Sequence, residues 1–533
     1  MTTQPAPVQP VLIDGDWRAA SAPVGQFRAE NPTTGEAIGP AFPVCGAADV
    51  EAALAAATAA AAELAATPPE RIAAFLEAYA DAIEADAEAL VDIAHAETAL
   101  PKQPRLAAVE LPRTTNQLRL AAKAVRSYAW TQPVIDTAAN LRSHLAPLGK
   151  PVLVFGPNNF PFAFNAIAGS DFASAIAARN PVIAKAHPSH PGTSERLARA
   201  AFAALRQAGL PAASVQMLYH FDHAIGGKLA GDARLGAIGF TGSRAGGLAL
   251  KAAADAAGIP AYVELSSVNP VFLLPGALAE RGIALAQEFF TSCTMGSGQF
   301  CTNPGVVIVP RGEAGDAFVE AAKAHFAAAA PSVLFSGGVL EHLQKGIATL
   351  RAAGAQLLAG GDTGSPGYRH APTLLEVDAA QFLREPQALQ TEAFGPASLL
   401  VRVDGVAQMV QVATAFEGNL TGTLYANSAD DAAWNDVAQA LRPRVGRLIA
   451  NRMPTGVAVS AAMNHGGPYP STGHPGFTAV GMPAAIRRFA ALHSYDNVPE
   501  HLLPPELRDH NPGGVARQID GCWCVDDLET KQA

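Results

Sequence analysis

Short apolar runs alternate with helical stretches between residues 150 and 265. The runs are too short for helices and rich in β-branched residues, and this pattern favours buried strands joined by crossover helices. Such alternation predicts a parallel, doubly wound α/β sheet covered on both faces. The predicted strands are Val152–Phe155, Pro181–Lys185, Val215–Leu218 and Ala237–Phe240, and the predicted helices are Ala163–Ala178, Ser194–Ala208 and Ala224–Ala230.

The rest of the chain extends this pattern on both sides. Alternation resumes near Val306–Val309, which predicts a second α/β layer between about residues 266 and 460. Near the start, Asp14-Gly15 between two apolar runs predicts a β-hairpin. Thr67-Pro68-Pro69-Glu70 predicts a helix start with the Thr67 hydroxyl as N-cap, and a further helix is expected from about Leu111 to Tyr128. The tail after Leu503, rich in proline, glycine and charge, is expected to lie over the surface.

Composition excludes several classes of protein. Hydrophobic residues make up 49% of the 533 positions and charged residues 16%, so the chain can bury large cores and is not a disordered protein. The net charge is −10 and no strongly basic tract occurs, which argues against nucleic acid or an anionic membrane as partner. No long uncharged apolar window and no signal peptide are found, and five cysteines in so long a chain make no disulfide framework. We therefore expect a cytoplasmic enzyme in a reducing environment.

Cys301 is the candidate nucleophile. It lies between Gly298 and Asn303-Pro304, a context typical of an accessible loop, whereas most cysteines are buried. A nucleophilic thiol needs that access together with groups that lower its pKa. Cys293 is expected in the core, and Cys522 and Cys524 are interpreted as structural because a metal site would need more ligands within reach. No metal is expected.

Four other positions allow both a structural and a functional interpretation. Thr241-Gly242-Ser243 follows a predicted strand and opens a helix, where free N–H groups suit a phosphate, yet the same tripeptide is also an ordinary turn. Lys185 ends a buried strand and must either reach water or meet an anion. Glu264 is a solvated strand end or a general base. Asn159 caps the following helix or donates to an oxyanion.

Taken in order, these pieces resemble the aldehyde dehydrogenase superfamily. The resemblance rests on six motifs over about four-fifths of the chain, and it is closest to 2-oxoglutarate semialdehyde (2,5-dioxopentanoate) dehydrogenases, with related NADP-linked fatty aldehyde dehydrogenases. Ser266-Ser267 replace the two glycines that most superfamily members carry after Glu-Leu, as in this subgroup. The motifs are Asn159-Phe160-Pro161, Lys185, Phe240–Ser243, Glu264-Leu265, Gly298–Cys301 and Glu392–Pro396, and the distinctive strings are Lys185–Ser194, Glu264–Val271 and His465–Pro470.

The resemblance implies an α/β fold with two doubly wound Rossmann-type domains and a small β extension used for oligomerisation. On that basis residues 1–130 and 150–265 form the cofactor-binding domain and residues 266–460 the catalytic domain. Residues 131–149 and 461–533 supply the oligomerisation strands and the C-terminal tail. A homodimer or a homotetramer is expected, with the segment Thr131–Pro147 pairing with a neighbouring subunit.

The resemblance also implies a mechanism. The Cys301 thiolate attacks the aldehyde carbon, and the Asn159 amide with the Cys301 backbone N–H holds the oxyanion. Hydride leaves for the nicotinamide, and Glu264 activates the water that hydrolyses the thioester. The remaining assignments are cofactor contacts: Glu392 at the nicotinamide ribose, Phe394 beside the ring, Lys185 at the adenosine ribose, Ser243 at the pyrophosphate and Gly226 as a close-approach position.

Two departures from the family pattern bear on the cofactor and the pocket. Asn158 stands where many members have tryptophan. Pro188 stands where NAD-preferring members commonly carry a glutamate that binds the ribose 2′-hydroxyl. Without that carboxylate a 2′-phosphate meets no repulsion, and Lys185, helped by His187 or His190 if protonated, attracts it. NADP is therefore favoured, with NAD as the alternative.

Three other functions remain open at this point. The same machinery would oxidise a medium- or long-chain aliphatic aldehyde, for which the pocket needs an apolar tunnel. The preferred substrate needs a cationic anchor instead, and Arg452 is the candidate. A catalytically inactive homologue is disfavoured by the intact set Asn159, Glu264 and Cys301. A cofactor-free cysteine hydrolase would require a histidine close to Cys301 and leaves Glu392 and Lys185 without a role.

Overall fold

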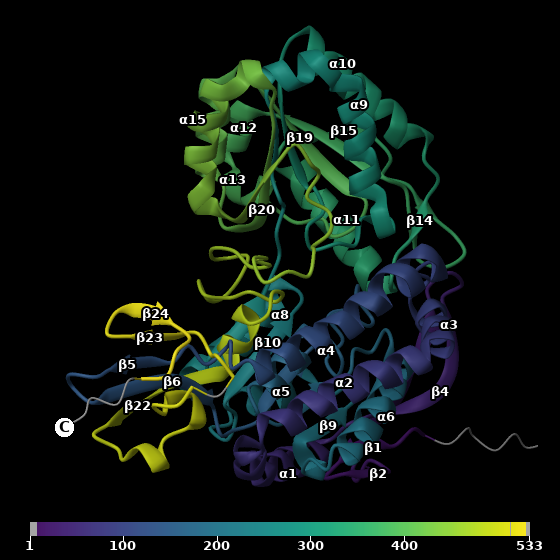
Figure 1. Ribbon diagram of the computed structural model, residues 1–533. Coiled ribbons are helices and arrows are strands. Elements are labelled where there is room, and N and C mark those ends of the chain that lie inside the picture. The colour runs from purple at the N-terminus through teal and green to yellow at the C-terminus, as the bar shows by residue number, and fades with distance from the viewer. Residues whose placement is uncertain (1–7, 512, 529–533) are drawn as a thin grey trace, which may run out of the picture.

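Two seven-stranded sheets organise the part of the chain that the computed structural model describes, residues 8–511 and 513–528. Figure 1 shows one sheet in each of two α/β bodies, with a separate β arm projecting from the first body. This arrangement confirms the predicted fold class. The first sheet has the order β11-β10-β7-β8-β9-β1-β2, with bounds Ala261–Glu264, Ala237–Thr241, Val152–Phe155, Val182–Lys185, Val215–Leu218, Val11–Ile13 and Asp16–Arg18.

Five of these strands run parallel, as their apolar runs predict, and they agree with the predicted bounds to within one residue where a prediction was made. The hairpin β1–β2 is also confirmed. Asp14 and Gly15 have φ values of 55° and 76°, and a two-residue hairpin loop with a type I′ turn needs positive φ at both of these positions. β1 then joins β9 in antiparallel fashion and extends the parallel sheet at one edge.

The helices that cover the first sheet differ from prediction at two places. They are α1 (Ala47–Ala66), α2 (Pro69–Ala85), α3 (Ala87–Thr98), α4 (Leu111–Arg126), α5 (Ser170–Ala177), α6 (Pro191–Gln207), α7 (His223–Ala230) and α8 (Arg244–Ala256), with a π-helical segment, η1, at Lys102–Glu110. The N-cap prediction for Thr67 is wrong: its hydroxyl donates to Glu63 O at 2.9 Å and closes α1, while Pro68 precedes α2 without a side-chain cap.

The predicted helix 163–178 is wrong over its first turns, because α5 begins only at Ser170. Side chains take the hydrogen bonds that a helix would use. Asn165 Nδ2 donates to Pro161 O at 2.9 Å, and its Oδ1 accepts from Ile167 N at 3.1 Å. The Glu110 carboxylate accepts from the backbone N–H groups of Phe162 and Ala163. Such side-chain contacts compete with helix formation, and here they hold the loop that carries Asn159.

The second sheet has the order β15-β18-β19-β13-β12-β20-β21, and all its neighbours are parallel except the β15–β18 pair at one edge. Its central strands are fully buried, which explains their continuous apolar sequences. The strands are Gln356–Ala359, Thr373–Asp378, Ala397–Val403, Val306–Pro310, Val271–Leu273, Asn419–Tyr425 and Val445–Ala450; the helices are α9 (Pro275–Thr294), α10 (Glu313–Ala328), α11 (Gly337–Ala352), α12 (Ala379–Arg384), α13 (Pro386–Leu389), α14 (Val406–Ala415) and α15 (Asp431–Leu441).

The arm is a five-stranded sheet made by two distant parts of the chain, in the order β22-β6-β5-β23-β24. β5 (Val134–Asp136) and β6 (Leu141–Pro147) come from the segment that leaves the first body. β22 (Ala490–Asp496), β23 (Arg517–Ile519) and β24 (Cys522–Cys524) come from the C-terminal part. β22 and β6 pair over seven residues. β23 and β24 lie beyond Leu503, so the tail contributes strands rather than only lying over the surface.

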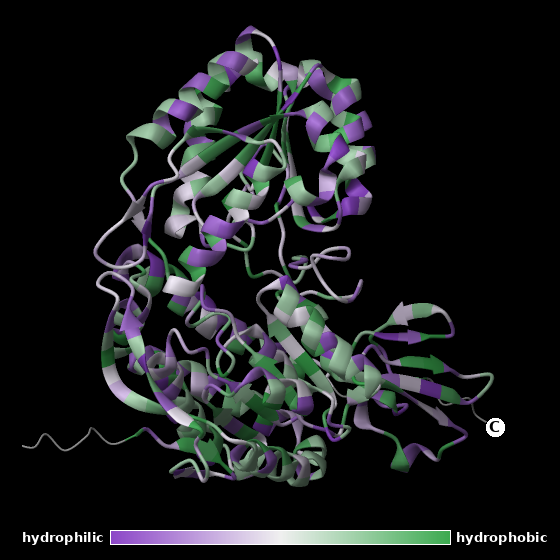
Figure 2. Cartoon of the chain, turned by 180° about the vertical axis from the view of Figure 1, so that it is seen from behind, coloured by the Kyte–Doolittle hydropathy of each residue, from purple (hydrophilic) through white to green (hydrophobic). Residues whose placement is uncertain are grey.

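Hydropathy follows this architecture. Figure 2 shows the interior strands of both sheets as hydrophobic and many of their covering helices as two-toned. Among the described residues no single helix is both long and apolar enough to cross a membrane, although α1 and α2, bent by 117° to one another, meet those two criteria as a pair. Two minor sheets complete the fold: β3 (Gly25–Asn31) with β4 (Glu36–Val44), and β14 (Ser332–Val333), β17 (Arg369–His370) and β16 (Thr363–Gly364).

Candidate active site

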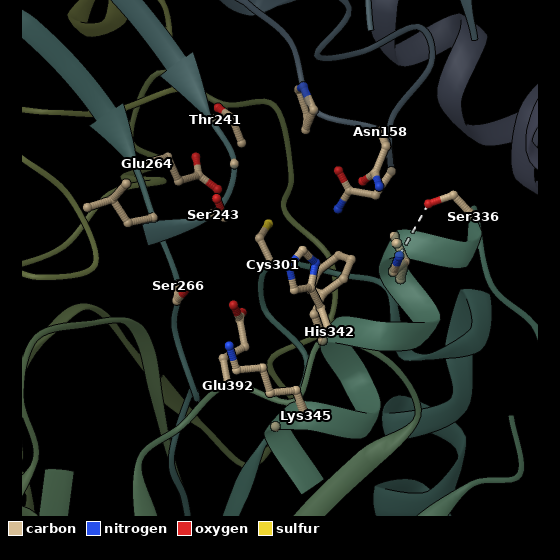
Figure 3. Close-up of a pocket in the computed structure, with 18 of the residues that line it drawn as sticks. Asn158, Thr241, Ser243, Glu264, Ser266, Cys301, Ser336, His342, Lys345 and Glu392 are labelled. Carbon is tan, nitrogen blue, oxygen red and sulfur yellow. Dashed lines mark hydrogen bonds between the residues drawn. The ribbon is translucent and has the colours of Figure 1, made fainter. Parts of the chain in front are cut away.

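A cavity of about 560 Å³ lies where the two bodies meet. The two sheets contribute opposite edges to it. The first sheet presents the carboxyl ends of its strands, and the second presents the loops that precede its strands. Figure 3 shows the Cys301 sulfur in this cavity, between the carboxylates of Glu264 and Glu392. We call this space the main cavity.

Strand register explains why the first sheet brings its residues together. Phe155 pairs with Lys185, and Thr241 pairs with Glu264, so these strands end at nearly the same level. The loops beyond those ends line the main cavity, as expected for a doubly wound sheet. They carry Pro157, Asn158, Asn159, His187, Thr241, Gly242, Ser243, Glu264, Leu265 and Ser266.

The second sheet adds the loops before β13 and β19, which are neighbouring parallel strands. Cys301 lies on the first loop, and Glu392 and Phe394 on the second. One face of α11 forms the remaining wall. This wall was not predicted, because nothing in the local sequence of α11 separates it from an ordinary amphipathic helix. It contributes Ser336, Gly338, Val339, His342, Lys345, Gly346 and Thr349.

Close backbone contacts hold the Cys301 loop. Gly298 has φ +68°, and a Cβ there would lie 2.1 Å from Gly395 O, so only glycine fits against the Glu392 loop. Asn269 Nδ2 donates to Cys301 O at 2.9 Å and to Asn303 O at 2.9 Å. The Cys301 loop is therefore tied both to the neighbouring loop and to the start of the second sheet. Cys293, by contrast, is fully buried on α9, as predicted.

His465 is the residue that sequence reasoning missed. Its Nε2 lies 3.3 Å from Cys301 Sγ and 3.1 Å from Glu264 Oε1, and the Glu264 and His465 side chains are each 2% exposed. Its backbone N–H donates to Thr478 Oγ1 at 3.0 Å. The string His465–Pro470 is distinctive in the sequence, but no local pattern links it to a cysteine 164 positions earlier. Only the tertiary structure brings the three side chains together.

The Cys301 thiol needs a neighbouring base to take its proton, because its surroundings raise its pKa. Burial raises the pKa of Cys301 well above its ordinary value, and the Glu264 carboxylate raises it further, while the Arg113 guanidinium acts in the opposite direction. A thiol of this kind is protonated at neutral pH unless a neighbouring base takes its proton. His465 and Glu264 are placed to do so. The donor atoms of all three residues lie within 4.8 Å of one another.

Asn159 lies at the entrance to the Cys301 loop. It is 5% exposed, and its Nδ2 donates to Gln299 O at 3.0 Å. An amide nitrogen carries two hydrogens, so one N–H remains for a ligand. The structure thus places a free donor beside the nucleophile.

Glu392 faces the same cavity from the opposite loop. Its carboxylate accepts a hydrogen bond from Ser267 N at 3.3 Å, and burial raises its pKa to about 7. Phe394 lines the cavity next to it. A carboxylate with free acceptor capacity suits a pair of hydroxyl groups.

The other predicted cofactor residues do not all line the main cavity. Ser243 lines the main cavity and caps α8, where its Oγ accepts from Gly246 N at 3.3 Å. Lys185 ends β8, and burial lowers its pKa to about 8. Burial also lowers the pKa of His190 to about 4 and that of His187 well below its ordinary value, so neither histidine adds charge near neutral pH. Gly226 lies within α7 against Phe221 and outside the cavity lining.

A second, aromatic environment adjoins Cys301. Phe160, Phe164, Phe300 and Phe477 form one buried cluster, which we call the aromatic cluster. Arg105 and Arg113 lie over its rings. Arg452, which sequence reasoning offered as the cationic anchor, is exposed.

Comparison with known proteins agrees with this geometry. Residues 17–489 match the sequence profile described as the aldehyde dehydrogenase family. The chain belongs to the aldehyde dehydrogenase family. It is 42% identical over 524 residues to alpha-ketoglutaric semialdehyde dehydrogenase 2 of Azospirillum brasilense, covering 96% of this chain and 98% of that protein. It is 37% identical over 467 residues to alpha-ketoglutaric semialdehyde dehydrogenase of Acinetobacter baylyi, with 85% and 88% coverage.

Solved structures show the same fold at lower identity. Lactaldehyde dehydrogenase from Escherichia coli superposes with a TM-score of 0.78 at 23% identity, covering 91% of this aldehyde dehydrogenase and 98% of that chain. Gamma-glutamyl-gamma-aminobutyraldehyde dehydrogenase from Burkholderia cenocepacia J2315 gives the same score at 24% identity, with 91% and 96% coverage. Membership of this family makes the protein an oxidoreductase that uses NAD or NADP.

Proposed function

We propose that this aldehyde dehydrogenase oxidises 2-oxoglutarate semialdehyde to 2-oxoglutarate, with NADP as its preferred cofactor. The observation that carries the catalytic part is the contact of Cys301 with His465, and of His465 with Glu264, beside the free N–H of Asn159. The substrate assignment is supported by the two alpha-ketoglutaric semialdehyde dehydrogenases at 42% and 37% identity.

Each step uses a group that the geometry supplies. His465 Nε2, 3.3 Å away, accepts the thiol proton, and the Cys301 thiolate adds to the aldehyde carbon to give a thiohemiacetal. The Asn159 amide and the Cys301 backbone N–H stabilise the resulting oxyanion. Loss of a hydride leaves a thioester on Cys301. Glu264, whose Oε2 is buried without a hydrogen-bond partner among the described residues, takes a proton from the water that cleaves the thioester.

The main cavity fits a nicotinamide dinucleotide. The N-terminus of α8, with Thr241, Gly242 and Ser243, offers backbone donors to a pyrophosphate. From the other wall, the Glu392 carboxylate would accept hydrogen bonds from the nicotinamide ribose hydroxyls, and Phe394 would contact the nicotinamide ring. When bound, the nicotinamide supplies the hydride acceptor. Gly226 and Lys185 have the weakest support among these assignments, because both lie outside the cavity lining.

The preference for NADP rests on Pro188 and Lys185. Pro188 leaves no carboxylate at the end of β8 to repel a 2′-phosphate. Lys185 is the cation available there, because His187 and His190 are held neutral. Lys185 therefore attracts the 2′-phosphate of NADP without help from the two histidines. The attraction is weaker than three cations would provide, and NAD remains the competing cofactor.

A cofactor-free cysteine hydrolase required a histidine next to Cys301, and the structure does contain one. Family membership and the placement of Glu392 beside the same cavity favour the dehydrogenase. A direct measurement separates the two functions. A hydrolase would release a carboxylate from an ester without forming NADPH, and would show no dependence on cofactor.

We also propose a homodimer or a dimer of dimers in the cytoplasm, assembled through the arm. The strands of the segment Thr131–Pro147 are paired on both sides within the chain, so they leave no edge for the strand pairing expected of that segment. β22 is the edge strand next to β6, and edges of this kind invite pairing with another chain. Five large hydrophobic side chains of the arm and the residue after it are exposed: Val134, Leu141, Leu492, Trp523 and Val525. In the same proposal the first body is the cofactor-binding domain and the second the catalytic domain.

The experiment that tests the function is a panel of aldehydes assayed for NADPH and for NADH formation. It should contain 2-oxoglutarate semialdehyde, other ω-carboxylated aldehydes and alkyl aldehydes of increasing length. We expect the highest kcat/KM with 2-oxoglutarate semialdehyde and NADP. Highest activity with long alkyl aldehydes would replace the substrate assignment by that of a fatty aldehyde dehydrogenase. No oxidation of any aldehyde would overturn the proposal.

A further inference from the structure

Arg113 is a half-buried cation that forms no ion pair with the described residues. It lies in the first turn of α4, and its Nε and Nη2 atoms are buried with no hydrogen-bond partner among the described residues. Its guanidinium lies 5.5 Å from the ring centroid of Phe160 and 5.1 Å from that of Phe164. Aromatic faces compensate a cation only in part, and burying unsatisfied guanidinium N–H groups is costly. A side chain held in this way is expected to gain a partner from outside the chain.

The other arginines near the site have partners for their terminal nitrogens or lie in solvent. Arg105 pairs with Glu110 and donates to Asn159 O at 3.0 Å, so it holds the loop of the oxyanion donor. Arg447 donates to two backbone carbonyls, those of Pro454 and Gly456. Arg452 is exposed. Arg105 leaves only its buried Nε without a partner among the described residues, because both of its Nη atoms are paired, whereas Arg113 leaves both Nε and Nη2 unused.

Arg113 is connected to Cys301 through the aromatic cluster. Phe160 contacts Phe300, the residue before Cys301, with ring centroids 5.5 Å apart, and Phe164 lies 5.9 Å from the ring of His465. Arg113 does not line the main cavity, nor do Phe164, Phe300 and His465. The Arg113 charge nevertheless acts on the Cys301 thiol. The guanidinium therefore lies close to the nucleophile but outside the space assigned to the cofactor.

We propose that Arg113 anchors the carboxylate of an acidic aldehyde, with the aromatic cluster packing against the carbon chain between the carboxylate and the carbon that Cys301 attacks. This inference rests on the proposed function and names the residue that selects the substrate class. A guanidinium presents parallel N–H donors that match the two oxygens of a carboxylate. An alkyl aldehyde would occupy the same rings but leave those donors unpaired. The site would thus favour an ω-carboxylated aldehyde over an alkyl aldehyde of equal length.

The test compares 5-oxopentanoate with pentanal, which have equal carbon number and differ in the terminal carboxylate. In Arg113→Met, kcat/KM for 5-oxopentanoate should fall about 10- to 100-fold, since a hydrogen bond to a charged group contributes about one to two decades. The value for pentanal should stay within about threefold of wild type or rise. Arg119→Met is the control, because it removes a cation of the same helix that pairs with Asp81 and Glu84, and it should change neither value. Arg452→Met tests the exposed arginine that the sequence offered as the anchor.

Binding without turnover gives a second readout. Glutarate should inhibit wild-type oxidation of pentanal competitively against pentanal, and Arg113→Met should lose that inhibition while keeping its affinity for NADP. Should Arg113→Met fail to fold, Arg113→Lys serves instead. It keeps the charge but loses the paired donors, and should lower kcat/KM for 5-oxopentanoate alone.

The outcomes separate this inference from the proposed function. Equal losses with 5-oxopentanoate and pentanal in both variants would mean that Arg113 only supports the fold, and would overturn the inference. So would a wild-type enzyme that oxidises the two aldehydes equally well, or a larger selective loss in Arg452→Met. A wild-type enzyme inactive on every aldehyde would instead overturn the proposed function.

Discussion

The two environments of the Cys301 sulfur differ in how they are built. The main cavity is formed by the strand ends of the first sheet, the loops before two strands of the second and one face of α11. The aromatic cluster draws on the Asn159 loop, the Cys301 loop and the segment around Phe477, with two arginines from η1 and α4. Parallel strands bring residues together by register, whereas the cluster depends on how irregular segments pack.

In the proposed function, the two environments would have different roles. Residues at strand ends are held by neighbouring strands and are suited to a cofactor of constant shape. Irregular segments can change without disturbing a sheet, so they suit the part of the site that recognises a particular substrate. Substitutions can test this comparison, beginning with Cys301, which belongs to both environments, and continuing with residues that belong to only one.

Removing the nucleophile should have the largest effect. Cys301→Ala should abolish aldehyde oxidation, because both environments act through its sulfur, while NADP binding measured by fluorescence should be nearly unchanged. Cys293→Ala should keep most activity and lower stability by about 1 kcal/mol, as for loss of a small buried group. If Cys293→Ala were inactive and Cys301→Ala active, the assignment of the nucleophile would be wrong.

Glu264 belongs to the main cavity and should act late. Glu264→Gln should lower steady-state turnover about 10²- to 10⁴-fold, the range typical of a lost general base. A rapid burst of NADPH should remain in stopped-flow traces, because hydride loss precedes hydrolysis. Loss of the burst together with turnover would show that Glu264 activates the thiol instead.

His465 touches the sulfur next to the aromatic cluster and should act early. His465→Gln should slow the burst itself by about 10- to 100-fold and move its pH midpoint upward, because the Cys301 pKa is raised by burial and no imidazole then takes the proton. Burst rates against pH measure this. Thr478→Val, which removes the contact to the His465 backbone but keeps the ring, should have a much smaller effect. An unchanged burst in His465→Gln would exclude the imidazole as proton acceptor.

Pro188 tests the adenosine end of the main cavity. Two like charges about 4 Å apart cost roughly 4 kcal/mol at an effective dielectric of 20. Less than half of this repulsion energy would already equal the roughly 1.4 kcal/mol that corresponds to a tenfold change in affinity. Pro188→Glu should therefore shift the ratio of kcat/KM for NADP over NAD toward NAD more than tenfold, while Pro188→Gln should shift it little. A wild-type enzyme that uses NAD at least tenfold better than NADP would contradict the proposed preference.

The smallest expected effect is a pH dependence of cofactor binding. The Lys185 pKa is lowered to about 8, so its ammonium is charged below that pH and loses its proton as pH rises through it. The KM for NADP should then rise several-fold between pH 7 and 9, and the KM for NAD should stay nearly flat. Parallel changes for both cofactors would show that Lys185 does not contact the 2′-phosphate.

Sequence alone determined the parts of this protein in which local pattern and tertiary environment agree. The parallel strands β7 to β10 are buried on both faces, so their sequences are continuously apolar and their bounds are readable. Asn159, Glu264 and Cys301 stand at the ends or turns of such elements, and ordered motifs identify them. The helix expected at 163–178 was wrong because Glu110 and Asn165 take over its first hydrogen bonds, and no local propensity reports a contact from a distant helix.

Only the tertiary structure brings His465 and Arg113 into the proposed site. His465 is 164 positions from Cys301, and Arg113 is on a helix whose periodicity is that of any amphipathic helix. Their roles depend on distances, on buried nitrogens without partners and on the pKa of a thiol surrounded by protein. These quantities arise from packing between segments far apart in the chain, and a linear pattern carries information only about neighbours along it.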